Sequence, residues 1–207
     1  MTEPEKDEAR KMFRVNLGCG RRPLEGYLNV DLMPAPGVQL VVNLEKAWPW
    51  ADNSVDEFNA DDFVEHIRQW WEEPDPEEWA LAVDGLDKGS GPRAALDVLG
   101  HLMTAIRHPQ RTYGIIHVAN EAWRCLRPHG MFRIKVPSTD GRGTWQDPTH
   151  VSYWNENSLL YLLENDVRAG LGSLMKAKFK IVSLEHAMST AKDRDIVWLK
   201  CVLAKVA

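Results

Sequence analysis

The chain has 207 residues, of which 44% are hydrophobic and 27% charged, with a net charge of −5. This length suits one well-buried domain, and the acidic balance argues against nucleic acid as the default partner. No apolar run reaches the roughly 18 residues of a membrane span, and the polar N-terminus lacks the apolar region of a secretory signal.

The first strands are predicted from alternation and from short apolar runs. Residues 1–12 are polar and charged, and we expect a flexible tail before a domain at 13–207. Apolar and polar residues then alternate into a glycine, which predicts a strand at 13–17, and a second strand follows at 27–31. The nearly continuous apolar run at 38–42 predicts a strand buried on both faces.

A fourth strand is expected at 54–60, and apolar residues at helical spacing predict a helix at 61–71. Residues 68–112 then form a long acidic segment with tryptophans, which we interpret as a helical insertion. Insertions in α/β enzymes often form lids or substrate walls. The equal alternative is a contact between copies in a homo-oligomer or a subdomain without a role at the site.

The second half predicts alternating helices and strands before a terminal hairpin. The expected helices lie at 113–126 and after a cap at Asn155 or Asn157, and the expected strands lie at 131–136, 179–186 and 195–206. Strands that alternate with helices indicate a mostly parallel sheet with helices layered on it. Ligands of such sheets bind outside the carboxyl ends of the strands.

A glycine turn and an acidic strand end mark that edge. Gly18, Cys19 and Gly20 follow the first strand, where glycines let the backbone approach a ligand closely. A dinucleotide fingerprint requires a third glycine where this chain has Pro23, so such a site is disfavoured. Asp31 ends the second strand, where a carboxylate can accept hydrogen bonds from both hydroxyls of a ribose.

Several ordered segments together resemble the class I S-adenosylmethionine-dependent methyltransferases, closest to a small bacterial type. They are 15–20 with 26–31, 48–56 (similar to "PFPDNSFD"), 63–67 ("VLEHI"), 122–130 ("RVLKPGG") and 147–150 ("DPTH"). The resemblance implies an α/β fold: a single Rossmann-like domain with a mostly parallel seven-stranded sheet, an antiparallel edge hairpin and helices on both faces. It also implies S-adenosylmethionine as the cofactor, with S-adenosylhomocysteine as the product.

The same resemblance assigns cofactor-binding residues. The glycine turn would contact the methionyl part, Asp31 the ribose, and the residues after the second, third and fourth strands the adenine and the rest of the cofactor. By position these are Gly18, Cys19, Gly20, Asp31, Leu32, Asn43, Leu44, Asp61 and Asp62. The family usually has Asp where this chain has Asn43, although an amide oxygen can also accept from an exocyclic amine. His66 is expected to be structural.

Methyl transfer from a sulfonium depends mainly on alignment, and a base is needed only if the acceptor loses a proton. Asp147 and His150 are the predicted catalytic residues, since their loop follows the fifth strand on the ligand side. A structural role that pins this loop is the alternative. The acceptor is unidentified; a small molecule is favoured over nucleic acid, because the amino-methylating motif and a Pro-Cys nucleophile are both absent.

A non-catalytic module that binds S-adenosylmethionine or adenosine is the other alternative. The three cysteines, Cys19, Cys125 and Cys201, are far apart and form neither a disulfide framework nor a zinc pattern. We therefore expect a cytoplasmic protein with no metal site and no membrane partner.

Overall fold

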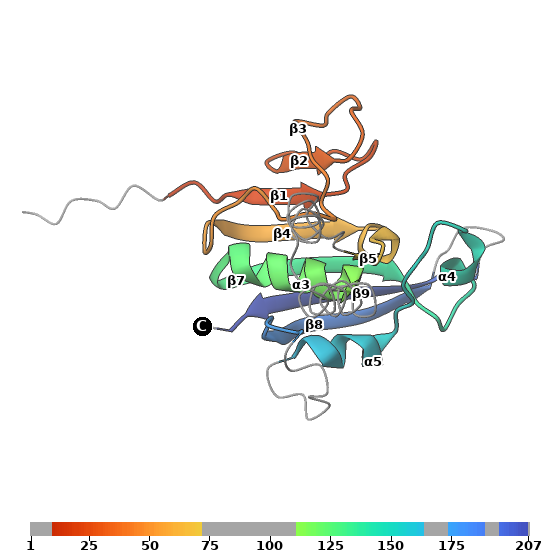
Figure 1. Ribbon diagram of the computed structural model, residues 1–207. Helices are drawn as coiled ribbons and strands as arrows, with labels where there is room; N and C mark the ends of the chain where they lie inside the picture. Colours follow the sequence, from red (N-terminus) through yellow and green to blue (C-terminus); the bar gives the residue numbers. More distant parts are fainter. Residues whose placement is uncertain (1–9, 72–110, 164–173, 189–194, 207) are drawn as a thin grey trace, which may run out of the picture. The chain divides into compact units, whose positions relative to one another are not determined.

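The computed structural model describes residues 10–71, 111–163, 174–188 and 195–206 (Figure 1). The chain divides into two compact units, Met1–Arg68 with Gly114–Ala207, and Gln69–Tyr113. In the second unit, β5 (Trp70–Trp71) pairs antiparallel with β6 (Arg111–Thr112). The rest of the predicted insertion, and most of the predicted N-terminal tail, lie outside the described residues.

The larger unit is built on a seven-stranded sheet with the order β3-β2-β1-β4-β7-β9-β8. The strands are β1 (Arg14–Leu17), β2 (Leu28–Asp31), β3 (Leu40–Val41), β4 (Val55–Asp61), β7 (Leu126–Pro137), β8 (Phe179–Met188) and β9 (Val197–Lys205). The first five in spatial order pair in parallel, whereas β9 pairs antiparallel with both β7 and β8. This confirms the predicted mostly parallel sheet and its antiparallel hairpin at one edge.

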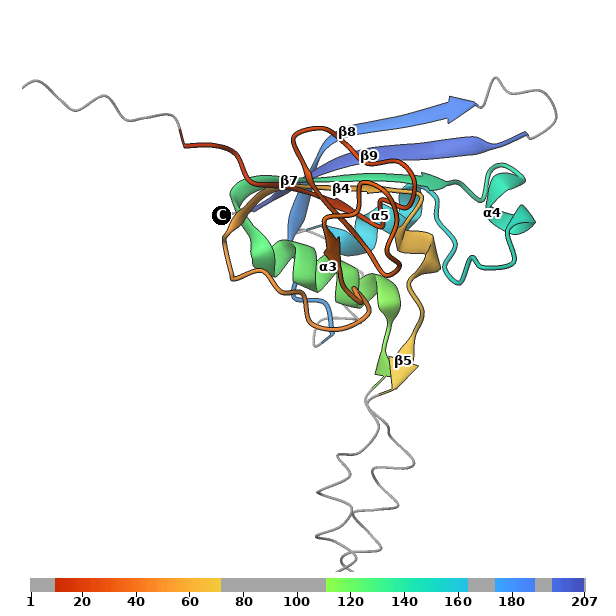
Figure 2. The same cartoon turned by 90° about the horizontal axis from the view of Figure 1, so that it is seen from above.

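Helices α3 (Gly114–Cys125) and α5 (Glu156–Leu159) lie on one side of this sheet (Figure 2). The connections from β1 to β2, from β2 to β3 and from β3 to β4 contain turns and no helix. The helices predicted on both faces are therefore seen on one face only in the described part of the chain. The prolines and glycines of these connections favour turns over a helix.

The two faces of the sheet differ in chemistry accordingly. Phe58 and Phe132 are fully buried on the helical side, where Trp48 and Trp50 pack edge-on and tilted against Phe58 with ring centroids 5.1 and 5.3 Å away. The opposite face carries a ladder of asparagines. Its bonds, both 2.9 Å long, run from Asn59 to Asn16 and from Asn16 to Asn29, across β4, β1 and β2. Asn16 and Asn29 are polar but buried, and the amides of the three asparagines satisfy one another across the strands.

Two predicted elements differ in the structure. The strand expected at 38–42 is only the two residues of β3, and Val41 is 53% exposed because β3 is the edge strand rather than a buried one. The helix expected at 61–71 is wrong as well. Strand β4 continues to Asp61, Asp62 turns the chain with a left-handed backbone (φ +61°), and only a short 3₁₀ helix, η1 (Val64–His66), follows.

Other local predictions are confirmed. Helix α3 matches the predicted helix at 113–126 within a residue, and it buries Ile116, Ala119 and Cys125 among others. Asn155 caps α5 through a capping box with Ser158, and the 3₁₀ helix η2 (Leu160–Leu162) continues it. None of the helices among the described residues is long and apolar enough to cross a membrane.

Arg124 joins two segments that are distant in the sequence. Its guanidinium donates to the carbonyl oxygens of Trp48 and Trp50 at 3.1 and 2.9 Å, and to carboxylates of Glu121 and Asp52. Glu121 also accepts from the backbone N–H of Trp48 at 2.7 Å. Burial alone would raise the pKa of Glu121, but these hydrogen bonds hold it below its usual value. The bonds fasten the loop before β4 to α3.

Candidate active site

The glycine turn after β1 lies at the edge of the sheet where the carboxyl ends of the parallel strands meet. Gly18 and Gly20 both have a left-handed backbone, with φ of +59° and +52°. A Cβ on Gly18 would overlap the ring of Phe63, whereas a Cβ on Gly20 would meet nothing within 4 Å. The turn is therefore packed on one side and open at Gly20, where a ligand could approach the backbone.

Asp31 lies directly against this turn. Its carboxylate accepts hydrogen bonds from the backbone N–H of Gly20 at 2.8 Å and of Met33 at 3.0 Å. An ionised carboxylate offers about four acceptor positions, so about two remain for the hydroxyls of a ribose. Leu32, the predicted neighbour of the adenine, is 53% exposed at the same place. The unused acceptor positions of Asp31 and the exposed Leu32 would suit the ribose and the base of an adenosyl group.

The remaining predicted cofactor residues differ in their surroundings. Burial, and secondly the charge of Asp31, raise the pKa of the Cys19 thiol, which therefore stays neutral. Asn43 Oδ1 accepts from the backbone N–H of Glu45 at 2.9 Å, which forms a turn. The side chain of Leu44 is buried in the core, and its carbonyl accepts from the Trp48 indole at 3.0 Å.

Asp61 and Asp62 connect the glycine turn with the next strand end. Asp61 pairs with Lys135 at 2.9 Å, and Asp62 pairs with Arg22 at 3.2 Å. Arg22 follows the glycine turn, so the pair joins the ends of β1 and β4. The sequence analysis did not assign Arg22, although its position directly after the turn was a usable signal.

A cavity of about 380 Å³ opens beside this pair, beyond the ends of β4 and β7. Its walls contain three of the predicted site residues, together with loop residues and the start of β9. The lining residues are Asp62, Pro137, Gly143, Gln146, Asp147, Pro148, His150, Ile196 and Trp198. The structure thus brings Asp62, Asp147 and His150 together, while the glycine turn and Asp31 lie outside this cavity.

The two predicted catalytic residues have different environments. Asp147 accepts from the hydroxyl of Thr149 at 2.6 Å and from its backbone N–H at 2.8 Å, and these bonds lower the pKa of Asp147. His150 is buried, and its Nδ1 lies 2.9 Å from the carbonyl oxygen of Thr144. Its Nε2 lies 4.0 Å from Asp147, too far for a hydrogen bond. Asp147 is thus a stable anion and a weak base.

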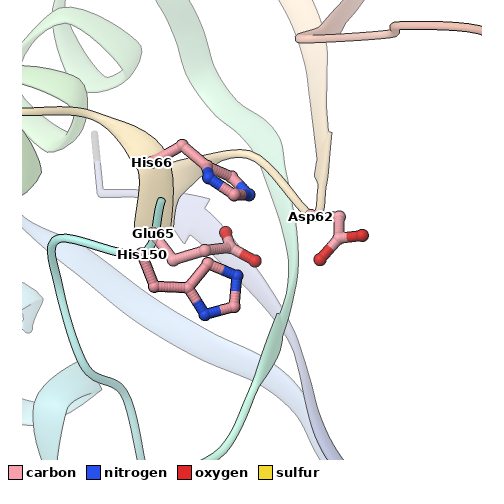
Figure 3. Close-up of side chains that lie close together, drawn as sticks. All are labelled: Asp62, Glu65, His66 and His150. Atoms are coloured by element: carbon pink, nitrogen blue, oxygen red, sulfur yellow. The ribbon is translucent and has the colours of Figure 1, made fainter. Parts of the chain in front are cut away.

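The sequence analysis missed Glu65, which lies beside His66 and His150 (Figure 3). Glu65 is 0% exposed, and neither of its carboxylate oxygens has a hydrogen-bond partner among the described residues. Burial raises the pKa of Glu65 to about 8, and the nearby carboxylates of Asp62 and Asp61 act in the same direction. The rings of His66 and His150 meet edge-on with centroids 4.8 Å apart. His66, expected to be structural, is thus part of this cluster.

No protein-family model matches this sequence, and no curated protein matches it. Solved structures do match its fold. A 1,6-didemethyltoxoflavin-N1-methyltransferase from Burkholderia thailandensis, with bound 1,6-didemethyltoxoflavin and S-adenosylhomocysteine, is 13% identical over 96% of this chain and 72% of its own, with a TM-score of 0.51. An Archaeoglobus fulgidus methyltransferase, described as dependent on S-adenosylmethionine, is 13% identical over 94% and 86%, with a TM-score of 0.50.

The chain therefore has the fold of the class I S-adenosylmethionine-dependent methyltransferases. A further structural neighbour, the [4+2]-cyclase SpnF, has a TM-score of 0.54 and is 11% identical over 96% of this chain and 76% of its own. The same fold thus occurs in a protein described by a different reaction, so function has to be argued from the site.

Proposed function

We propose that this protein binds S-adenosylmethionine at the glycine turn and Asp31, and transfers its methyl group to a small molecule held in the adjoining cavity. The proposal depends on three features that lie together. The backbone at Gly20 is open to a ligand, the Asp31 carboxylate beside it has unused acceptor positions, and a cavity lies at the ends of the next strands. In the Burkholderia thailandensis neighbour, the same fold holds S-adenosylhomocysteine and 1,6-didemethyltoxoflavin.

On the cofactor side, the chain contributes hydrogen bonds and charge. Asp31 would hold the ribose, Leu32 would lie beside the adenine, and Gly18, Cys19 and Gly20 would border the methionyl part. Asn43 and Leu44 are assigned to the adenine side by resemblance. The pair of Arg22 with Asp62, at 3.2 Å, supplies a cation and an anion for the carboxylate and ammonium of the methionyl group.

On the acceptor side, the cavity has the size of a small-molecule site. Trp145 and Tyr153 stack beside its lining loop with ring centroids 4.7 Å apart, and both are exposed, which favours a flat acceptor. When bound, the cofactor would supply an electrophilic methyl group. The cavity would align the acceptor with it, and His150 is the residue we assign to the acceptor. With Nδ1 occupied, its Nε2 is able to take a proton or to bind a cation.

Calorimetric titration with S-adenosylhomocysteine tests the cofactor site. The Asp31→Ala variant should bind at least about 10-fold more weakly than the wild type, because it loses a charge-assisted pair of hydrogen bonds. Glu25→Ala, which removes an exposed carboxylate from the same β1–β2 connection, is the matched control. Circular dichroism checks that both variants fold. Equal affinity of wild type and a folded Asp31→Ala would remove the ribose assignment.

Transfer itself is tested with S-adenosylmethionine that carries a labelled methyl group. The label should move to low-molecular-weight compounds of a cell extract, and not to RNA, DNA or protein added separately. Transfer to RNA or DNA would support the nucleic-acid alternative. Cofactor binding with no transfer to any fraction would support the non-catalytic module.

A further inference from the structure

Four potential metal ligands converge at the wall of the cavity. One ligand atom from each of Asp62, Glu65, His66 and His150 lies within 4.8 Å of the others. They come from three separate places: the end of β4, helix η1 and the loop after α4 (Gly143–Gln146). Figure 3 shows the Glu65 carboxylate beside both imidazole rings, with Asp62 facing the group.

The hydrogen bonds outside the cluster prepare both histidines as ligands. Nδ1 of His150 lies 2.9 Å from the Thr144 carbonyl oxygen, which can only accept, so this nitrogen carries the proton. Nδ1 of His66 lies 3.0 Å from the hydroxyl of Thr149, whose own proton goes to Asp147. His66 therefore also donates from Nδ1. Each neutral ring keeps its lone pair on Nε2, which is the arrangement that outer partners impose on metal-bound histidines.

Glu65 supplies an independent observation. Its carboxylate is fully buried, and neither oxygen has a partner in the described part of the chain. Burial without a partner disfavours the ionised form of Glu65, and a cation bound beside it would offset this penalty. The Glu65 backbone is fixed as well, because its carbonyl accepts from the N–H groups of Val151 and Ser152 at 2.8 and 3.2 Å. These bonds hold the loop of His150 against η1.

We propose that Asp62, Glu65, His66 and His150 bind one divalent transition-metal ion. Two carboxylates balance its charge, and two imidazoles with two carboxylates suit Mn²⁺, Fe²⁺, Co²⁺ or Zn²⁺ better than Mg²⁺, which prefers oxygen ligands and retains its waters. Asp62 and His150 also line the cavity, so an acceptor held there would be able to reach the ion. The scattered cysteines had suggested that the protein has no metal site, and this proposal replaces that expectation.

The ion has a consequence for the acceptor that rests on the proposed function. An acceptor in the cavity would bind the ion through a hydroxyl or carboxylate oxygen, and a bound hydroxyl would release its proton more readily to solvent water in the open cavity. In that case His150 acts as a ligand and does not itself take the proton. Formation of the metal site does not depend on methyl transfer.

Titration of the full-length, chelator-treated protein with Co²⁺ tests the site, followed by the visible absorption of the bound ion. We expect one equivalent to bind, and Glu65→Gln and His66→Gln to weaken binding at least about 10-fold, because losing even an outer partner of a metal ligand typically costs about 10–100-fold. Glu185→Gln, an exposed carboxylate on β8, is the control and should bind as the wild type does. Electron paramagnetic resonance with Mn²⁺ provides a second readout.

Urea unfolding of each variant separates loss of the site from loss of the fold. If Glu65→Gln does not fold, the Co²⁺ affinity of His66→Gln tests the site instead. The His66 ring is only partly buried, so its replacement should leave the fold intact. Equal Co²⁺ binding by the wild type and folded variants, or no stoichiometric binding by the wild type, would overturn the metal site. Binding of S-adenosylhomocysteine to metal-free protein is measured in parallel, so that failure of the metal site and failure of the cofactor site are distinguished.

Discussion

The two glycines of the turn after β1 form a matched pair for testing why each is a glycine. Both have a left-handed backbone, which costs an alanine about 1–2 kcal/mol. Only at Gly18 does an added methyl group overlap Phe63, whose ring Cγ would lie 2.9 Å away. Overpacking of this kind typically costs about 1–3 kcal/mol. Gly18→Ala should therefore lower the free energy of unfolding by about 2–5 kcal/mol, and Gly20→Ala by about 1–2 kcal/mol.

Urea unfolding followed by tryptophan fluorescence measures both values, with unchanged m-values as the check on two-state behaviour. Phe63→Ala removes the overlapping Cγ and ring atoms and should recover about 1 kcal/mol or more of the Gly18→Ala loss in a double-mutant cycle. The same substitution should not rescue Gly20→Ala. If Gly18→Ala destabilises the protein no more than Gly20→Ala does, the packing explanation is wrong.

Because the turn is open at Gly20, a substitution there also tests where the cofactor binds. The methyl group of Gly20→Ala would project into the space that we assign to the methionyl part of the cofactor. We expect its affinity for S-adenosylhomocysteine to fall by at least about 10-fold while most of the stability remains. Unchanged affinity, measured by calorimetry, would place the ligand away from Gly20.

Three further predictions concern contacts that hold the fold. Glu121→Gln should lower the free energy of unfolding by about 1–2 kcal/mol at pH 7. Because folding lowers the pKa of Glu121, the difference in stability between variant and wild type should shrink below about pH 4.5 in urea titrations. A difference that stays constant down to about pH 3 would contradict this reasoning. Lys205→Met removes hydrogen bonds of 2.7 and 2.8 Å to the Asn53 side chain and to the Leu126 carbonyl oxygen. The variant should lose about 1–3 kcal/mol of folding stability, which calorimetry would measure as a lower Tm. Asn155→Ala removes the cap of α5 and should cost about 1 kcal/mol; no change in chemical unfolding would show that the cap contributes nothing.

Signals that lie within one stretch of chain could be predicted. The apolar stripe of α3, the asparagine cap of α5 and the pairing of β8 with β9 each depend on residues close in sequence. The mostly parallel sheet follows from the alternation of strands and helices. Asn16 and Asn59 each lie between apolar residues, so the alternation in the sequence already indicated that one face of the sheet is polar.

The sequence by itself determined the order of the strands along the chain and the glycine turn followed by Asp31, because local propensity and periodicity control these features. Only the tertiary structure decided that β3 is an edge strand, that the segment after Asp61 is not a helix, and that Glu65 is buried against His66 and His150. Burial and ligand geometry depend on which distant segments meet. In this chain the loop of His150 reaches Glu65 through backbone hydrogen bonds, and no local pattern encodes that contact.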